Sequence, residues 1–128
     1  MDAIGNFLTI IRNGIMASKS VVIGRHSKMH QQIGDILKSE GFIKDCSVVD
    51  QEGKKFLKVV LKYVDGESVI HEINRVSTPG RRCYVGASSI KPVIGGLGVS
   101  ILTTNRGVIS NKKAHEYTVG GEVICTIW

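Results

Sequence analysis

The residues best suited to chemistry in this chain lie in a stretch without acids. Between Glu72 and Glu116 the sequence has no Asp or Glu and has six glycines. The same stretch has seven basic residues: Arg75, Arg81, Arg82, Lys91, Arg106, Lys112 and Lys113. Positive charges with no internal counter-charge repel one another, so they favour an external polyanion. The chemistry offered here is anion recognition, and we interpret the stretch as a nucleic-acid-binding surface.

A polar run, Thr-Thr-Asn-Arg-Gly, lies inside this stretch. The candidate binding residues in and just after it are Thr103, Thr104, Asn105, Arg106, Gly107, Ser110 and Lys112. Hydroxyl and amide side chains can hydrogen-bond to phosphate, to ribose hydroxyls or to base edges. A guanidinium adds charge-assisted hydrogen bonds, and glycine lets the backbone come close to a partner. The alternative is an ordinary polar hairpin loop, but the acid-free surroundings favour binding.

A second candidate segment pairs arginines with an aromatic ring. Tyr84 can stack on a base or ribose while Arg82 contacts phosphate. Strand alternation would place these two side chains on one face and those of Arg81 and Cys83 on the other. The alternative is that Tyr84 is simply packed, and the segment taken alone slightly favours that alternative.

Other chemistries lack their residues. Gly95-Gly96-Leu97-Gly98 follows an expected helical turn and precedes a strand, whereas a dinucleotide site needs the opposite order. His26 and His30 have the i, i+4 spacing of metal ligands, but no third ligand lies nearby, so a solvated helix end is favoured. No carboxylate pair or nucleophile motif appears. We therefore predict no enzyme activity, no metal and no cofactor.

The whole composition describes a small folded basic protein. The 128 residues carry a formal net charge of +6 and are 42% hydrophobic, which is enough for a core. Such a charge suits nucleic acid, an anionic membrane or an acidic protein. Three scattered cysteines predict free thiols on strands in a reducing compartment. We expect no signal peptide and no membrane span, because no apolar run approaches roughly 20 residues.

The expected elements place these candidates in two domains. Residues 1–65 predict the order α-β-α-β-β: a helix capped by Asp2, a strand at 20–23, a helix from Ser27 to Gly41, and strands at 42–49 and 54–63. Asp65-Gly66 is the expected boundary. Residues 66–128 predict a mainly β domain. Its expected elements are strands at 69–76, 82–85, 99–102 and 122–128, a helical turn at 88–94 and a short basic helix from Ser110 through Glu116. The fold class is therefore α/β, of the α+β kind.

Several short motifs, taken in order, resemble the family of small ribosomal subunit protein number eight in its bacterial or organellar form. They are residues 8–13 (Leu-Thr-Ile-Ile-Arg-Asn), 27–29 (Ser-Lys-Met), 40–43 (Glu-Gly-Phe-Ile), 75–80 (Arg-Val-Ser-Thr-Pro-Gly), 96–98 (Gly-Leu-Gly), 103–107 and 120–125 (Gly-Gly-Glu-Val-Ile-Cys). No single motif is decisive, but their order along the whole chain is highly specific.

The resemblance implies a two-domain α/β protein of the ribosome, either cytoplasmic or organellar. It implies binding to a helix in the central domain of small-subunit ribosomal RNA and an early role in subunit assembly. By the family pattern, the second domain makes the main contact through residues 103–107, with Tyr84 and Glu122. The first domain adds contacts near Thr9, Arg12, Asn13 and Lys28. The implied protein partners are neighbouring ribosomal proteins, chiefly the fifth of the small subunit. Some relatives repress their own messenger RNA, and the sequence leaves that open here.

Departures from the family pattern fall in the contact loop. Where the family has Ser-Thr-Ser-Lys-Gly, this chain has Thr103, Asn105 and Arg106 in place of the two serines and the lysine. Ile10 and His30 also replace commonly basic residues. We hypothesise that Asn105 and Thr104 read unstacked bases while Arg106 and Lys112 hold the RNA backbone. The alternative functions are a basic protein-interaction module with an acidic partner and, more weakly, a small anion-binding enzyme.

Overall fold

The computed structural model of the chain describes residues 2–128, which form two compact units. The N-terminal unit is Ala3–His71, and the C-terminal unit comprises Glu72–Trp128 together with Asp2. Both units combine helices with antiparallel sheets, so the predicted α/β class is confirmed. No helix in residues 2–128 has the length and apolarity that a membrane crossing requires.

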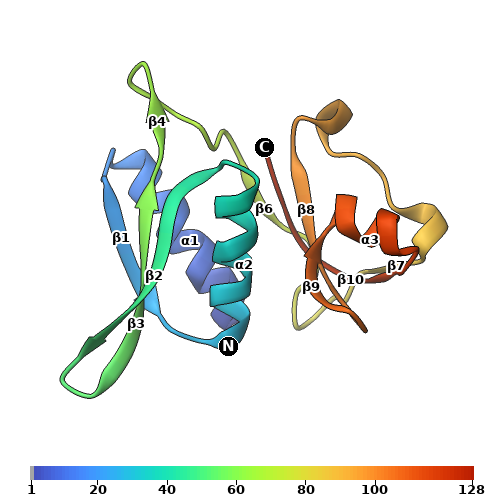
Figure 1. Cartoon of the computed structure of the whole chain (residues 1–128), viewed down its shortest axis with the longest axis horizontal. Coiled ribbons are helices and arrows are strands. Elements are labelled where there is room, and N and C mark those ends of the chain that lie inside the picture. The colour runs from blue at the N-terminus through green and yellow to red at the C-terminus, as the bar shows by residue number, and fades with distance from the viewer. Residues whose placement is uncertain (1) are drawn as a thin grey trace. The chain divides into compact units, whose positions relative to one another are not determined.

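The N-terminal unit follows the predicted order α-β-α-β-β. Its elements are α1 (Ala3–Met16), β1 (Val21–Arg25), α2 (Lys28–Ser39), β2 (Ile43–Gln51) and β3 (Lys54–Leu61), followed by a small hairpin of β4 (Tyr63–Val64) and β5 (Glu67–Ser68). The main sheet has the order β1-β3-β2, and both helices cover the same face of it (Figure 1). Asp65 and Gly66 form the turn of the β4–β5 hairpin, and both have positive φ.

The core of this unit follows from the periodicity of its elements. Apolar side chains of α1 and α2 at helical spacing meet every second side chain of β3, and these residues are buried: Phe7, Leu8, Ile11, Ile33, Leu37, Leu57, Val59 and Leu61. Ser27 begins α2 as predicted, because its hydroxyl accepts from the His30 amide at 3.0 Å. Gly41, with φ of 83°, ends it.

His30 is not part of a solvated helix end. Its side chain is buried, and its ring stacks on Phe7 with ring centroids 4.6 Å apart. Its Nδ1 lies 3.0 Å from the carbonyl of Arg25. His26 instead contacts Gln31 through Nε2 at 2.9 Å. The solvated-end interpretation is therefore wrong for His30, which is a packed core residue.

The C-terminal unit is an antiparallel sheet with one helix against it. Its elements are β6 (Ile73–Arg75), β7 (Tyr84–Val85), two short 3-10 turns (Ala87–Ser89 and Ile94–Gly96), β8 (Val99–Thr104), β9 (Gly107–Ser110), α3 (Asn111–Tyr117) and β10 (Gly121–Ile127). The strand order is β6-β10-β8-β9, and β7 also pairs with β10. Figure 1 shows α3 beside β8 and β9, with which it is in contact.

Several predicted elements of this unit differ from the structure. The strand expected at 69–76 is only Ile73–Arg75, because Val69 bonds back to Lys62 and Ile70 donates to the Ser68 hydroxyl. The strand expected at 82–85 is shortened to Tyr84–Val85. Two 3-10 turns replace the helical turn expected at 88–94, and β9 was not predicted.

The acid-free stretch has more internal counter-charge than its sequence indicates. Arg75 pairs with Asp2 at 3.2 Å, Arg82 with Glu122 at 3.1 Å, and Lys113 with Glu116 at 3.9 Å. These three acids lie outside the stretch in sequence, and folding brings them to it. The expectation of no internal counter-charge is thus wrong at three positions. Within residues 2–128, three other cations of the stretch have no ion pair: Arg81, Lys91 and Arg106.

The cysteines match the predicted free thiols. Cys46 lies on β2, Cys125 on β10 and Cys83 just before β7. Burial disfavours the thiolate, so it raises the pKa of Cys46 to about 11 and that of Cys125 to about 12. Both thiols therefore behave as small apolar side chains, with Cys125 in the core and Cys46 partly buried.

Candidate nucleic-acid interface

The polar run forms the tight turn between β8 and β9. Thr104 and Gly107 face each other across the hairpin, and Gly107 has φ of 99°, a left-handed conformation that favours glycine. The Thr104 hydroxyl donates to the Gly107 carbonyl at 2.9 Å and accepts from the Arg106 amide at 3.0 Å. These bonds close the turn and leave Asn105 and Arg106 exposed at its tip.

The two side chains predicted to read bases are therefore not equivalent. The only hydroxyl proton of Thr104 is used inside the turn, so this group offers an incoming base an acceptor but no donor. Asn105 has no such internal bond among those of the turn, and its amide both donates and accepts. Asn105 is thus the better placed of the two for reading a base edge.

Arg106 lies over an aromatic ring. Its guanidinium carbon is 4.3 Å from the centroid of Tyr117, in α3, and Lys113 Nζ is 6.0 Å from the same centroid. Lys113 and Tyr117 are four residues apart on the helix, so they share one of its faces. The guanidinium has its donors in its own plane, so contact between its face and the ring leaves them available for an anion. Arg106, Lys113 and Tyr117 form what we call the tip cluster.

Helix α3 is fixed by two buried polar side chains at its start. The Ser110 hydroxyl accepts from the Lys113 amide at 3.3 Å, as predicted for a cap. Asn111 Oδ1 accepts from the Ser100 amide at 3.2 Å, which ties the helix to β8. Ser110 is only 3% exposed, and in this structure its hydroxyl caps the helix; its contact with RNA stays a prediction.

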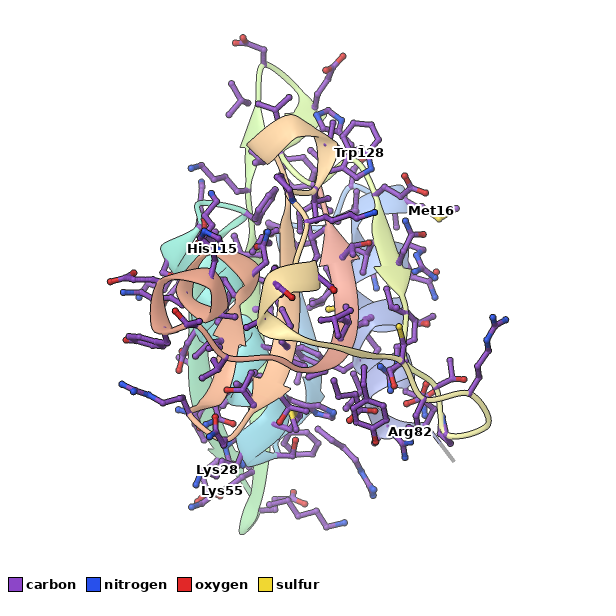
Figure 2. The ribbon with its side chains drawn as sticks, turned by 90° about the vertical axis from the view of Figure 1, so that its right-hand side faces the viewer. Met16, Lys28, Lys55, Arg82, His115 and Trp128 are labelled. Carbon is purple, nitrogen blue, oxygen red and sulfur yellow. The ribbon has the colours of Figure 1, made fainter. Side chains whose placement is uncertain are left out.

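Lys112 faces a different neighbourhood from the tip cluster. It lines a hollow of about 170 Å³ together with Lys91 and His115. Figure 2 labels His115 on α3 and Arg82 near the opposite edge of the C-terminal unit. Lys113 lies near the same Tyr117 ring as Arg106, whereas Lys112 extends the basic surface beside Lys91 and His115.

A row of side chains crosses the sheet next to the hairpin. Glu122 on β10 pairs with Tyr84 on β7 and with Thr103 on β8. Directly paired residues of neighbouring strands point to the same face, so the structure brings these three predicted residues together. Tyr84 is 68% exposed, so the packed alternative for this residue is wrong. Gly121 is the residue before Glu122 on β10. A Cβ at this position would lie 2.2 Å from the Thr103 carbonyl oxygen, so the close approach of the two strands requires glycine here.

Glu122 is held as an anion inside this basic surface. Its carboxylate accepts hydrogen bonds from the Ser77 hydroxyl and from Arg82, and its side chain is 17% exposed. The bond from Ser77, followed by the charge and hydrogen bond of Arg82, lowers the pKa of Glu122 despite partial burial. Ser77 also accepts from the Cys83 amide at 3.2 Å. Glu122 therefore attaches the segment 77–83 to the sheet.

Comparison with known proteins agrees with the order of these motifs. The family model for ribosomal protein S8 matches residues 2–128. The chain belongs to this family. It is 49% identical to the small ribosomal subunit protein uS8 of Rhizobium etli strain CIAT 652 and 48% identical to that of Agrobacterium fabrum, covering 99% of this chain and 97% of each relative. It is also 48% identical to uS8 of Ruegeria sp. strain TM1040, covering 98% of that relative.

The residues that the family pattern assigns to the first domain lie in the N-terminal unit. Thr9, Arg12 and Asn13 are exposed on one face of α1, and the Thr9 hydroxyl donates to the Gly5 carbonyl at 2.8 Å. Lys28 is exposed at the start of α2. In Figure 2, Lys28 and Met16, the last residue of α1, lie toward opposite ends of this unit. The four residues thus come from two different helices of the unit.

Sequence reasoning missed three residues of the C-terminal surface as site residues. Tyr117 lies against both Arg106 and Lys113, and Ser77 donates to Glu122. The i, i+4 spacing of Lys113 and Tyr117 could have indicated a shared helix face, but the contact of Tyr117 with Arg106 depends on how α3 packs on the hairpin. Among residues 2–128, no group of three or more His, Cys, Asp or Glu side chains is placed to hold a metal ion.

Proposed function

We propose that this protein is a structural component of the small ribosomal subunit and binds a helix in the central domain of its ribosomal RNA. Members of the family are ribosomal and structural rather than enzymatic. The observation that carries the proposal is the hairpin tip, where Asn105 and Arg106 are exposed, Arg106 lies over Tyr117, and Arg106 has no ion pair within residues 2–128. Proposed along with it are an early role in subunit assembly and a place in the ribosome.

In the proposed contact, the side chains at and near the hairpin tip have different roles. Arg106 and Lys112 hold phosphates, and Asn105 reads the edge of a base. Because the deep major groove of a regular RNA helix is closed to side chains, the site must be irregular, with unstacked bases. Tyr84 offers an exposed ring on which such a base or its ribose can stack.

The remaining family contacts are part of the same proposal. Thr9, Arg12, Asn13 and Lys28 are proposed to add contacts to RNA from a first domain of residues 1–65, with residues 66–128 as the main binding domain. The fifth protein of the small subunit is the proposed protein neighbour. Binding to the protein's own messenger RNA would require a copy of the same irregular site in that message.

Binding of the purified chain to a hairpin of its central-domain helix tests the proposal. A second hairpin, with the internal loop replaced by regular pairs, is the control RNA. We expect Arg106→Gln to weaken binding to the natural hairpin about fivefold or more, since a charge-assisted hydrogen bond is lost. Asn105→Ala should reduce the preference for the natural hairpin over the regular one.

The outcomes separate specific recognition from general basicity. Lys44→Gln removes an exposed charge of the N-terminal unit and should leave binding nearly unchanged. If Asn105→Ala lowers affinity for both hairpins equally, the base-reading role is wrong. If unrelated duplex RNA or an acidic peptide competes as well as the natural hairpin, the surface binds anions without specificity. That result would favour the alternative of a basic protein-interaction module with an acidic partner.

A further inference from the structure

A hollow of about 410 Å³ lies on the N-terminal unit and involves no residue assigned above. It is lined by Arg25, His26, Lys54, Lys55 and Phe56. These residues come from the end of β1 and the start of β3, which are far apart in sequence but adjacent in the sheet. Three cations and a flat ring therefore meet in one concave place.

The hollow arises because the two neighbouring strands differ in length. β1 ends at Arg25, opposite Phe56, and the chain then turns away at His26 toward α2. β3 extends further, through Lys54 and Lys55, which pair only with β2. The His26 amide donates to the Lys55 carbonyl at 3.4 Å at this step. The sheet thus passes from three strands to two, and the step leaves the concave space.

The cations that line the hollow are not neutralised. Arg25, Lys54 and Lys55 are exposed, no acid lines the space, and none of the three has an ion pair in residues 2–128. Asp50 is the cross-strand partner of Lys55 on β2, but the two form no ion pair. A concave surface with unmatched positive charge attracts an anion.

The aromatic ring narrows the class of anion. Phe56 is partly exposed and directly opposite Arg25, so the two side chains share one sheet face, and Lys54, two residues before Phe56, is on that face too. Lys55 alternates to the other face of β3 and borders the hollow from that side. A base can stack on such a ring while its phosphate meets the cations. We propose that this hollow binds an unpaired nucleotide of single-stranded RNA. An acidic peptide would match the cations but would leave the ring unused.

This site is a further RNA contact, on residues of the N-terminal unit that the proposed function does not use. The choice of RNA as the polyanion rests on the proposed function. The site itself does not, because its residues are separate from the C-terminal surface. Figure 2 shows Lys55 at the same end of the N-terminal unit as Lys28, with Met16 toward the other end. Its test can therefore use variants that leave the hairpin tip intact.

Binding of labelled octa-adenylate to the full chain, followed by fluorescence anisotropy across salt, tests the site. We expect the double variant Lys54→Gln with Lys55→Gln to weaken binding at least about fivefold. The slope of log K against log salt should become less negative by about 1.4, which is two phosphate contacts at roughly 0.7 each for a single strand. Phe56→Leu keeps the charge and most of the apolar volume, so it should weaken binding about fivefold with an unchanged slope. Arg25→Gln, at an exposed position, tests the same site if Phe56→Leu impairs folding.

The matched control is Lys19→Gln with Lys44→Gln, which removes two exposed charges from the same unit outside the hollow. It should change the affinity less than twofold. The proposal is overturned if the control weakens binding as much as the Lys54 and Lys55 double variant does. It is also overturned if octaglutamate displaces the oligonucleotide at equal charge concentration.

The two RNA proposals fail separately. Arg106→Gln should weaken the ribosomal hairpin and leave octa-adenylate binding unchanged, whereas the Lys54 and Lys55 double variant should do the reverse. If only the expected effect of Arg106→Gln on the ribosomal hairpin is missing, the proposed function is contradicted. If only the expected effect of the Lys54 and Lys55 double variant on octa-adenylate is missing, the nucleotide site in the hollow is contradicted.

Discussion

Asn105 and Arg106 occupy the same turn but are controlled by different neighbours. The turn itself is closed by Thr104, whose hydroxyl makes both of its local bonds with the backbone. The Arg106 side chain, in contrast, rests on Tyr117 from a different element. A long flexible side chain loses rotamer entropy when it binds phosphate, and a ring that holds it beforehand reduces that loss. Tyr117 is therefore a positioning residue for Arg106.

We predict that Tyr117→Leu weakens binding to the ribosomal hairpin about two- to fivefold, the range that follows from roughly 0.5–1 kcal/mol for an exposed cation–π contact. Tyr117→Phe keeps the ring and should bind like the unchanged protein. The measurement is hairpin affinity by anisotropy in a double-mutant cycle with Arg106→Gln. If Tyr117→Leu weakens binding just as much when Arg106 is already absent, the positioning role is wrong.

At this scale the sequence predicted residue types better than their contacts. The exposed polar tip follows from the local pattern, because Thr, Asn and Gly favour turns. The internal use of the Thr104 hydroxyl, the stacking of Arg106 and the burial of His30 depend on packing between elements. A linear pattern does not contain those distances, which is why Tyr117 and Ser77 were missed.

Strand β10 organises the C-terminal surface at the scale of elements. It pairs with β6, β7 and β8, so it joins the candidate row to the rest of the sheet. The segment 77–83 reaches β10 through Ser77 and Arg82, both of which donate to Glu122. This attachment depends on a carboxylate whose pKa is lowered chiefly by the Ser77 hydroxyl.

We predict that Ser77→Ala destabilises the protein by roughly 1–2 kcal/mol at neutral pH, the cost of losing a hydrogen bond to a charged group. A carboxyl whose pKa is lower in the folded state stabilises the fold above its unfolded pKa, and that contribution is lost as the pH falls through the folded pKa. The difference in unfolding free energy between the two proteins should therefore shrink in acid. Urea unfolding at a series of pH values measures it.

Glu122→Gln provides the control for this prediction. An amide does not titrate, so adding Ser77→Ala to that variant should produce a difference in stability that is independent of pH. The role of Glu122 is contradicted by one result. It is a difference in unfolding free energy between the unchanged protein and Ser77→Ala that stays constant from neutral pH to below the folded pKa of Glu122.

The elements of the two units were not equally predictable. In the N-terminal unit, clear helical and alternating periods with caps such as Ser27 produced the correct order. In the C-terminal unit, β6 and β7 are three and two residues long, too short to show a period. Their pairing with β10 makes them strands, so only the three-dimensional arrangement defines them.

For the whole molecule, the number of basic residues overstates the positive charge that is available to RNA. The chain has 17 Lys and Arg residues, but Arg75, Arg82 and Lys113 are matched by acids in the folded structure. What matters for binding is the number of phosphates that the surface neutralises, because each one releases condensed counterions.

We predict a slope of roughly −3.5 to −5.5 for log K against log salt with the ribosomal hairpin, from about four to six neutralised phosphates at about −0.9 each. Arg106→Gln should make the slope less negative by about one, whereas Asn105→Ala should not change it. Titration from low to moderate salt measures both. An unchanged slope for Arg106→Gln would mean that this residue does not contact phosphate.

The order of the strands along the chain has a consequence for synthesis. β10 is made after β6, β7, β8 and β9, although three of these strands pair with it. A nascent chain that stops before residue 121 already has the polar hairpin, but it lacks the strand that carries Glu122 and supports the row. Chains that stall or terminate early should therefore compete poorly with the complete chain for the proposed RNA site.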